Sequence, residues 1–331
     1  MNEKQLKSLL RNLSGKTIAV IGDLMADSYI WGTVSRISPE APVPVVDVES
    51  EQLRLGGAAN VAHNIQSLGG TPLLFGAVGD DSTGRKLLSI MRENDFATKG
   101  VIVDDTRPTT VKTRIIAHNQ HVVRVDRESR TEISRSMRAK LVDSLRKNIG
   151  SIDGIIIEDY NKGVVVRELI CEVIDLAHKK KKTITVDPKF NNFFEFQNVT
   201  VFKPNRKEVE EVLGLRMSDD KHVIAAGKEL MKRLKPECVL LTRGEQGMTL
   251  FENNGAISHV ATTASRVADV SGAGDTVIAT LTMALVGGAT MKEAATLANI
   301  AGGVVCGYVG IVPIKKNELL EAALTQDTPR R

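Results

Sequence analysis

The sequence predicts an α/β fold in which helices cover both faces of a largely parallel sheet. Six short apolar runs end in turn residues, as strands buried on both faces do. They are residues 17–23, 71–80, 154–159, 183–187, 199–205 and 238–244. Segments with helical spacing lie between several of them, at 58–68, 134–147, 164–178 and 221–234. Strands that alternate with helices along a chain favour a parallel sheet.

The two ends of the chain each predict a helix. Four leucines recur at helical spacing between Leu6 and Leu13, and the charged residues before them argue against a signal peptide. Residues 294–314 carry no charge over a length that a bilayer requires. Because this stretch contains four glycines and Pro313, we interpret it as a buried helix followed by a turn and a strand, and we expect no membrane partner.

Two segments interrupt the α/β alternation. Residues 28–53 contain three prolines followed by alternating valines, and residues 109–128 are typical of a hairpin with its turn at Asn119-Gln120. We expect both to form antiparallel strands of a small lid. No internal repeat or low-complexity linker divides the sequence, so residues 1–331 are predicted to form one domain.

Composition excludes several classes of protein. With 42% hydrophobic and 25% charged residues, the 331-residue chain is neither disordered nor collagen-like. A net charge of +4 and 4% aromatic residues argue against a nucleic-acid partner. The three cysteines are far apart and form no C-x-x-C pair, which favours a reducing cytoplasm and predicts neither a zinc site nor a disulfide.

Polar residues stand where several predicted strands end. Open α/β sheets bind ligands beyond the carboxyl ends of their strands, so these residues are placed for chemistry. For any single one of them, a strand that simply runs into a polar loop is the better explanation. The positions are Asp23, Asp80, Glu158-Asp159, Asp187, Asn205 and Thr242-Arg243.

The sharpest motif is the segment DVSGAGDT at 269–276, which precedes an apolar helix. Backbone N–H groups at Gly272, Ala273 and Gly274, together with the helix dipole, favour an anion such as a phosphoryl group in transit. Asp275 could then accept the proton of an attacking hydroxyl. Its place at a helix start predicts an ionised carboxylate and hence a weak base. A glycine-rich N-cap with no catalytic role explains the same residues equally well.

Two further segments open predicted helices. GGAAN at 56–60 combines small residues, which allow close approach, with the Asn60 amide, which could bind sugar hydroxyls. Asn205 followed by Glu208 reads as a capping box. The functional interpretation of this pair places both near a nucleotide-bound Mg²⁺ ion, through water, because Mg²⁺ keeps much of its hydration shell.

Taken together, GGAAN and DVSGAGD resemble, in this order, the two signatures of the ribokinase-type (PfkB) sugar kinases. The resemblance covers nearly the whole chain and implies a ribokinase-like three-layer sandwich. It implies ATP as phosphoryl donor and Asp275 as catalytic base. It places Asn205 and Glu208 in the magnesium motif and allows for a monovalent cation such as K⁺. The expected nucleotide-binding residues are Asn205, Glu208, Thr242, Arg243, Gly244, Gly247 and Asn299.

Within that family the chain most resembles the D-glycero-D-manno-heptose 7-phosphate kinases. RISPEAPVP at 36–44, DPK at 187–189 and PNR at 204–206 carry this resemblance. It implies phosphorylation of the anomeric hydroxyl to give the 1,7-bisphosphate on the way to ADP-heptose for lipopolysaccharide. The expected sugar-binding residues are Asp23, Asp27, Gly56, Gly57, Asn60 and Glu158. The expected cations for the 7-phosphate are Lys112, Arg114, Arg124, Lys162 and Lys189.

The chain departs from these kinases in two places and lacks one motif. Tyr308 stands within a segment that usually reads G-K-x-G-T, and Phe190 follows DPK where glycine is usual. The sequence has no H-x-G-H motif of the nucleotidyltransferase that many relatives carry, so kinase activity alone is expected. Because an exposed lid would leave a sheet edge uncovered, we also expect a homodimer formed through the lid.

Two other functions explain the same motifs. A PfkB-type kinase could act on another sugar phosphate, such as fructose 1-phosphate or tagatose 6-phosphate. A catalytically silent regulator that binds sugar or nucleotide would need the same pocket but would have no use for Asp275.

Overall fold

The computed structural model describes residues 1–118, 120–262 and 267–326. Within these residues the larger sheet has the strand order β13-β12-β11-β10-β9-β8-β1-β4-β5. Strands β11 through β5 in this order pair in parallel, and β12 and β13 add antiparallel at one edge. The bounds are β1 Thr17–Gly22, β4 Thr71–Gly79, β5 Val101–Asp104, β8 Gly154–Glu158, β9 Thr183–Asp187, β10 Val201–Phe202, β11 Cys238–Thr242, β12 Met248–Glu252 and β13 Ile257–Val260.

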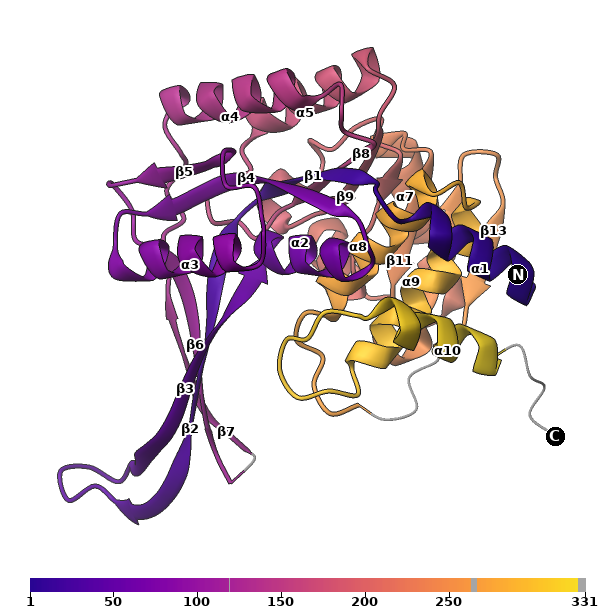
Figure 1. Ribbon diagram of the computed structural model, residues 1–331. Coiled ribbons are helices and arrows are strands. Elements are labelled where there is room, and N and C mark those ends of the chain that lie inside the picture. Colours follow the sequence, from indigo (N-terminus) through magenta and orange to yellow (C-terminus); the bar gives the residue numbers. More distant parts are fainter. Residues whose placement is uncertain (119, 263–266, 327–331) are drawn as a thin grey trace.

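Helices cover both faces of this sheet, as the sequence predicts (Figure 1). Alternate residues of β1 serve two cores: Ile18 and Val20 belong to one, and Ala19 and Ile21 to the other. The first core is shared with α1 Glu3–Asn12, α2 Ala58–Ser67, α3 Ser82–Glu93, α8 Ala273–Val286, α9 Met291–Val305 and α10 Lys316–Gln326. The second is shared with α4 Arg135–Asn148, α5 Arg167–Lys179, α6 Arg206–Leu213 and α7 Asp220–Leu234.

The end of the chain corrects one expectation. Helix α9 is buried as predicted, but a turn and irregular chain at 306–315 lead into α10, where we expected a strand. The glycines of this stretch instead let the chain pass close to the lid, where Gly310 lies against the Tyr29 ring. In the described part of the chain, no helix has the length and apolar character needed to cross a membrane.

The lid is a second sheet that projects from the body (Figure 1). Its order is β3-β2-β6-β7, with bounds β2 Leu24–Ile37, β3 Pro44–Gly57, β6 Thr110–Ala117 and β7 Gln120–Arg127. The pairs β2–β3 and β6–β7 are antiparallel as expected, whereas β2 and β6 run parallel. Asn119 of the expected hairpin turn lies outside the described residues. Strand β2 begins before residue 28 and strand β3 ends after residue 53, so both reach further toward the body than predicted. The expected sugar-binding residues Asp27, Gly56 and Gly57 therefore lie in the strands at the base of the lid.

Candidate active site

Asp275 lies in the first turn of α8 and is held from two sides. The Tyr160 hydroxyl donates to its Oδ1 at 2.6 Å, and the Asn60 amide donates to its Oδ2 at 2.7 Å. The carboxylate is 2% exposed. Three segments far apart in the sequence therefore meet at one acidic group, beyond the carboxyl ends of the parallel strands.

Burial changes the acidity that the sequence suggests for Asp275. Helix-start placement predicted an ionised, weakly basic carboxylate, but loss of hydration on burial raises the pKa of Asp275 to about 6. The hydrogen bonds from Tyr160 and Asn60 lower this pKa, while nearby carboxylates raise it. The expectation of a weak base is therefore wrong, and a pKa near neutrality suits a general base better.

Gly272 makes the turn into α8. Its φ of 77° lies in the left-handed region that favours glycine, and a Cβ there would be 2.9 Å from the Asn60 amide nitrogen. Helix α8 begins at Ala273, whose N–H bonds to the Val270 carbonyl at 3.3 Å. The N–H groups of Gly272 and Gly274 have no hydrogen-bond partner among the described residues, so they remain free beside Asp275. A Cβ on Gly274 would be 3.6 Å from Asp187 Oδ2 and 3.9 Å from Lys203 Nζ, which places this loop against the ends of β9 and β10.

The GGAAN segment joins the lid to α2. A Cβ on Gly56 would come within 2.1 Å of Asp27 Oδ2, so only glycine fits beside that carboxylate. Gly57 is the N-cap of α2 with a φ of 55°. Asp27 forms a buried ion pair with Arg114 on the neighbouring strand β6. These contacts bring Gly56 and Asp27 of the expected sugar site together with Arg114 of the expected phosphate site.

Asp23, at the end of β1, holds the loop that follows β8. Its carboxylate accepts backbone N–H groups from Tyr160 at 2.9 Å, Lys162 at 3.1 Å and Val164 at 3.1 Å. The Asp23 contacts in this structure are therefore those of a loop anchor. The same loop is tied to the end of the lid, where Glu128 forms an ion pair with Lys162 at 2.7 Å.

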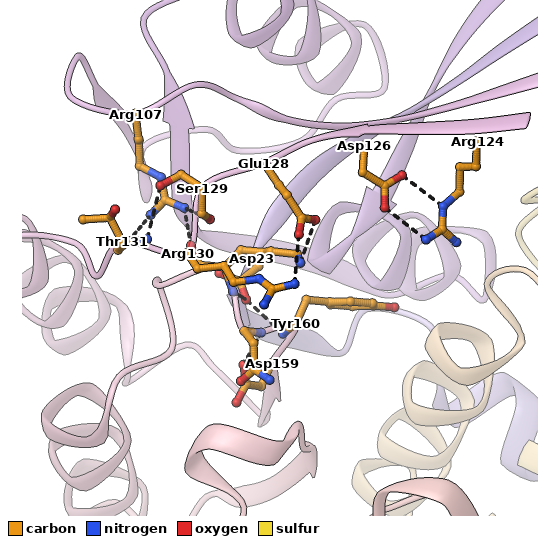
Figure 2. A network of polar contacts seen from close by, with 12 residues as sticks. Asp23, Arg107, Arg124, Asp126, Glu128, Ser129, Arg130, Thr131, Asp159 and Tyr160 are labelled. Carbon is orange, nitrogen blue, oxygen red and sulfur yellow. Dashed lines mark hydrogen bonds and ion pairs between the residues drawn. The ribbon is translucent and has the colours of Figure 1, made fainter.

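Arg107 completes this connection. Its guanidinium donates to the carbonyl oxygens of Ser129 and Thr131, both at 3.3 Å, and to that of Lys162 (Figure 2). The chain that leaves the lid and the loop that carries Tyr160 are thus fastened to one side chain.

A buried charge cluster lies at the ends of β8, β9 and β10. Lys203 pairs with Asp187 at 2.8 Å. Glu158 is adjacent to Asp187 in register, and its Oε2 has no hydrogen-bond partner among the described residues. Burial, followed by repulsion from Asp187 and Asp275, raises the pKa of Glu158 well above its ordinary value. Burial and the neighbouring carboxylates therefore both favour the protonated form of Glu158.

Four of the five cations expected for the substrate phosphate have acidic partners. Arg114 pairs with Asp27, Arg124 with Asp126, Lys162 with Glu128 and Lys189 with Glu208. Arg124 lies opposite Arg114 in register, but its side chain is 59% exposed and directed to Asp126. In the described chain Lys112 has no acidic partner within ion-pair distance. Its Nζ lies 4.9 Å from the centroid of the Tyr160 ring.

Asn205 and Glu208 form the capping box of α6. Asn205 Oδ1 accepts the Glu208 N–H at 3.0 Å, and Glu208 Oε2 accepts the Asn205 N–H at 2.8 Å. Glu208 Oε1 pairs with Lys189. Among the residues described, no three His, Cys, Asp or Glu side chains gather to hold a metal. The engaged oxygens fit a Mg²⁺ ion held through water and nucleotide phosphates, and they do not fit an all-protein metal cage.

The other expected nucleotide residues gather near β11 and β12. Thr242 bridges to Asn205, the Arg243 N–H bonds to the Gly247 carbonyl, and the Asn299 amide donates to the Ala261 carbonyl at 2.7 Å. Gly244 and Gly247 both have positive φ. A cavity of about 370 Å³ opens here, lined by Asp220, Arg243, Glu245, Gln246, His259, Ala261 and Thr262.

Sequence reasoning assigned no role to three residues of the site. Nothing in the sequence shows that the Tyr160 hydroxyl reaches Asp275. Asp187 was recognised as a strand end and as part of the DPK segment, without a role of its own. The sequence could have indicated a buried ion pair at Lys203, because a lysine inside the apolar run VTVFKPN is expected to be buried and therefore paired. In the structure Lys203 is 3% exposed.

Comparison with known proteins places the chain in a family. The family model described as pfkB family carbohydrate kinase matches residues 16–316. A bifunctional protein HldE from Geobacter sulfurreducens is 42% identical over 320 residues, which cover 97% of this chain and 65% of the relative. A protein of the same name from Helicobacter pylori strain J99 is 44% identical over 89% of this chain and 64% of the relative. The chain thus spans just under two thirds of these relatives.

Solved structures share the fold. Phosphofructokinase-2 from Escherichia coli in complex with potassium superposes with a TM-score of 0.77 at 18% identity, covering 95% of this chain and all of that chain. Arabidopsis thaliana ribokinase complexed with ribose and ATP gives 0.72 at 18% identity, covering 93% and 98%. The ribokinase-like fold predicted from the sequence is confirmed, and with the family match over most of its length the chain belongs to the pfkB family of carbohydrate kinases and is a sugar kinase.

Proposed function

We propose that the protein transfers the γ-phosphoryl group of ATP to the anomeric hydroxyl of D-glycero-D-manno-heptose 7-phosphate, in the synthesis of ADP-heptose for lipopolysaccharide. The observation that supports phosphoryl transfer is Asp275, a buried carboxylate beside the free N–H groups at the start of α8. The heptose substrate is supported by the resemblance of the sequence to heptose 7-phosphate kinases and by the HldE relatives.

In this reaction Asp275 accepts the proton of the anomeric hydroxyl. The oxygen forms a bond to the γ-phosphorus while the bond from that phosphorus to the β–γ bridging oxygen breaks, and ADP leaves with the electron pair. The N–H groups of residues 272–274 stabilise the charge on the transferring group. Bound Mg²⁺ would neutralise charge on the β- and γ-phosphates, with Asn205 and Glu208 holding its water shell.

The sugar 7-phosphate requires a cation, and Lys112 is the best candidate. It lies on the lid strand β6 near the Tyr160 ring, and burial lowers the pKa of Lys112 although Asp27 and Asp126 act in the opposite direction. In the described chain no carboxylate lies within ion-pair distance of its Nζ. An arriving phosphate would supply the missing partner. Lys162 and Lys189 can join it by exchanging their carboxylates for phosphate oxygens.

Two features of the lid favour the proposed homodimer. Its outer strands β3 and β7 are sheet edges within the chain, and five of its apolar side chains are largely exposed. These are Ile37, Val43, Val48, Val123 and Val125. A second lid packed on this surface would cover both an edge and the apolar groups. A requirement for K⁺ is a further prediction, suggested by the potassium complex of phosphofructokinase-2.

The test is ADP release from Mg²⁺-ATP with a panel of acceptors: both anomers of heptose 7-phosphate, fructose 1-phosphate and tagatose 6-phosphate. Turnover with heptose 7-phosphate alone supports the proposal. Turnover with another acceptor would retain the mechanism and overturn the heptose assignment. Binding of ATP without turnover on any acceptor would favour a silent regulator.

A further inference from the structure

The loop after β8 brings Tyr160 to the acidic group at the start of α8. The phenol oxygen lies 2.6 Å from Asp275 Oδ1, a length typical of an O–H donor to a charged carboxylate. Tyr160 is the second donor to this carboxylate, beside Asn60. The two bonds occupy one lone pair on each oxygen and leave the remaining lone pairs for a substrate proton.

The loop that carries Tyr160 is fixed more firmly than a surface loop requires. Its N–H groups at Tyr160, Lys162 and Val164 all bond to Asp23. Asn161 adopts a φ of 54°, a left-handed conformation that asparagine tolerates better than most residues, and its N–H bonds to Asp159 at 2.8 Å. These backbone hydrogen bonds anchor the loop on both sides of Tyr160.

The Tyr160 ring is fixed as well. Lys112 Nζ lies 4.9 Å and Lys189 Nζ 5.5 Å from its centroid, both within range of a cation–π contact. These lysines come from the lid and from the end of β9. The phenol thus has an anchored backbone and a ring in contact with two lysines, and within the described chain its hydroxyl donates to Asp275.

We propose that Tyr160 is a positioning residue for Asp275: its hydroxyl orients the carboxylate and holds it in the charged form that accepts a proton from the acceptor sugar. This rests on the proposed function, in which Asp275 is the base. Tyr160 can donate to Oδ1 only while that oxygen lacks a proton, so the bond favours the ionised carboxylate. The carboxyl groups of Asp27, Glu158 and Asp187 also face Asp275 and oppose its ionisation. Lys203 Nζ lies near the same loop.

The experiment compares Tyr160→Phe with wild type in pH profiles of kcat and KM. Loss of one hydrogen bond to a charged group predicts that the acidic limb of kcat/KM moves up by about one pH unit. At pH 6 turnover should fall about fivefold, because the ionised fraction of Asp275 drops from about one half to about one tenth, with a smaller loss at pH 9 and a nearly unchanged KM for the sugar. Tyr29→Phe is the matched control, because it removes a buried phenol hydroxyl that accepts the Ile311 N–H and does not contact Asp275.

A second measurement needs no substrate. The ¹³C carboxyl resonance of Asp275, assigned by its loss in Asp275→Asn, should titrate about one pH unit higher in Tyr160→Phe and at the wild-type midpoint in Tyr29→Phe. An unchanged midpoint in Tyr160→Phe would overturn the proposal, and so would faster turnover, which would mean that the phenol blocks the acceptor site. Because this titration is independent of the acceptor panel, failure of the heptose assignment leaves it interpretable.

Discussion

The side chain of Asn60 lies directly against the backbone of Gly272. A Cβ on Gly272 would be 2.9 Å from the Asn60 amide nitrogen, the same atom that donates to Asp275. The start of α2 and the start of α8 are thus fitted to each other without room for a methyl group.

This close approach predicts that Gly272→Ala disables the enzyme. The methyl group would displace Asn60 and release one oxygen of Asp275, and turnover should fall at least about tenfold. Gly288→Ala is the control, since Gly288 also has a positive φ, of 95°, but no atom within 4 Å of an added Cβ. Both variants should lose about 1–2 kcal/mol of stability from backbone strain. Equal turnover in the two variants would contradict the role given to this contact.

Asp275→Asn should retain ATP binding and lose turnover. Removing a general base costs about 100- to 10,000-fold in rate, and the asparagine preserves shape while it cannot take a proton. ADP release and ATP titration by calorimetry measure the two properties separately. Asp175→Asn, at an exposed position of α5, serves as control and should behave as wild type.

The raised pKa of Asp275 predicts how activity depends on pH. Because the base must be ionised, kcat/KM should fall about tenfold per pH unit below about pH 6. A pH-rate profile of the wild type between pH 5 and pH 9 tests this. A flat profile across pH 6 would show that another group limits the reaction.

The raised pKa of Asp275 also makes the stability of the fold depend on pH, and stability changes with pH in the opposite direction to activity. Between the ordinary value of 3.8 and about 6, the folded carboxyl keeps a proton that the unfolded chain has lost. The stabilisation contributed by this group is therefore present below about pH 4 and is lost as pH rises through about 6. Thermal unfolding should show wild type losing stability relative to Asp275→Asn across that interval. A constant difference would argue against the raised pKa.

Lys203→Met should destabilise the fold strongly. Lys203 and Asp187 are an ion pair buried at 3% and 10% side-chain exposure, and removing one partner leaves a buried charge that costs about 3–5 kcal/mol. Arg146→Met breaks the exposed pair with Asp143 and should cost at most about 1 kcal/mol. Urea unfolding measures both, and comparable losses would contradict this account.

The sequence predicts the body of the fold well because its signals are local. Apolar runs and turn residues located β1, β4, β8, β9, β10 and β11, and helical spacing located α2, α4, α5 and α7, whereas β5 was not predicted. The parallel pairing of β2 with β6 could not be predicted, because it depends on where two distant segments meet. The pKa of Asp275 was wrongly predicted for a similar reason: a helix start is visible in the sequence, but burial among distant side chains is not.

The residues around Asp275 are contributed by α2, the loop after β8 and α8, whose contacts join opposite ends of the chain. No short fragment contains them all, and each contact requires a long loop to close before it forms. During refolding, secondary structure in the body should therefore appear before any catalytic competence does. Recovery of activity after dilution from denaturant then reports the last long-range docking event of the domain.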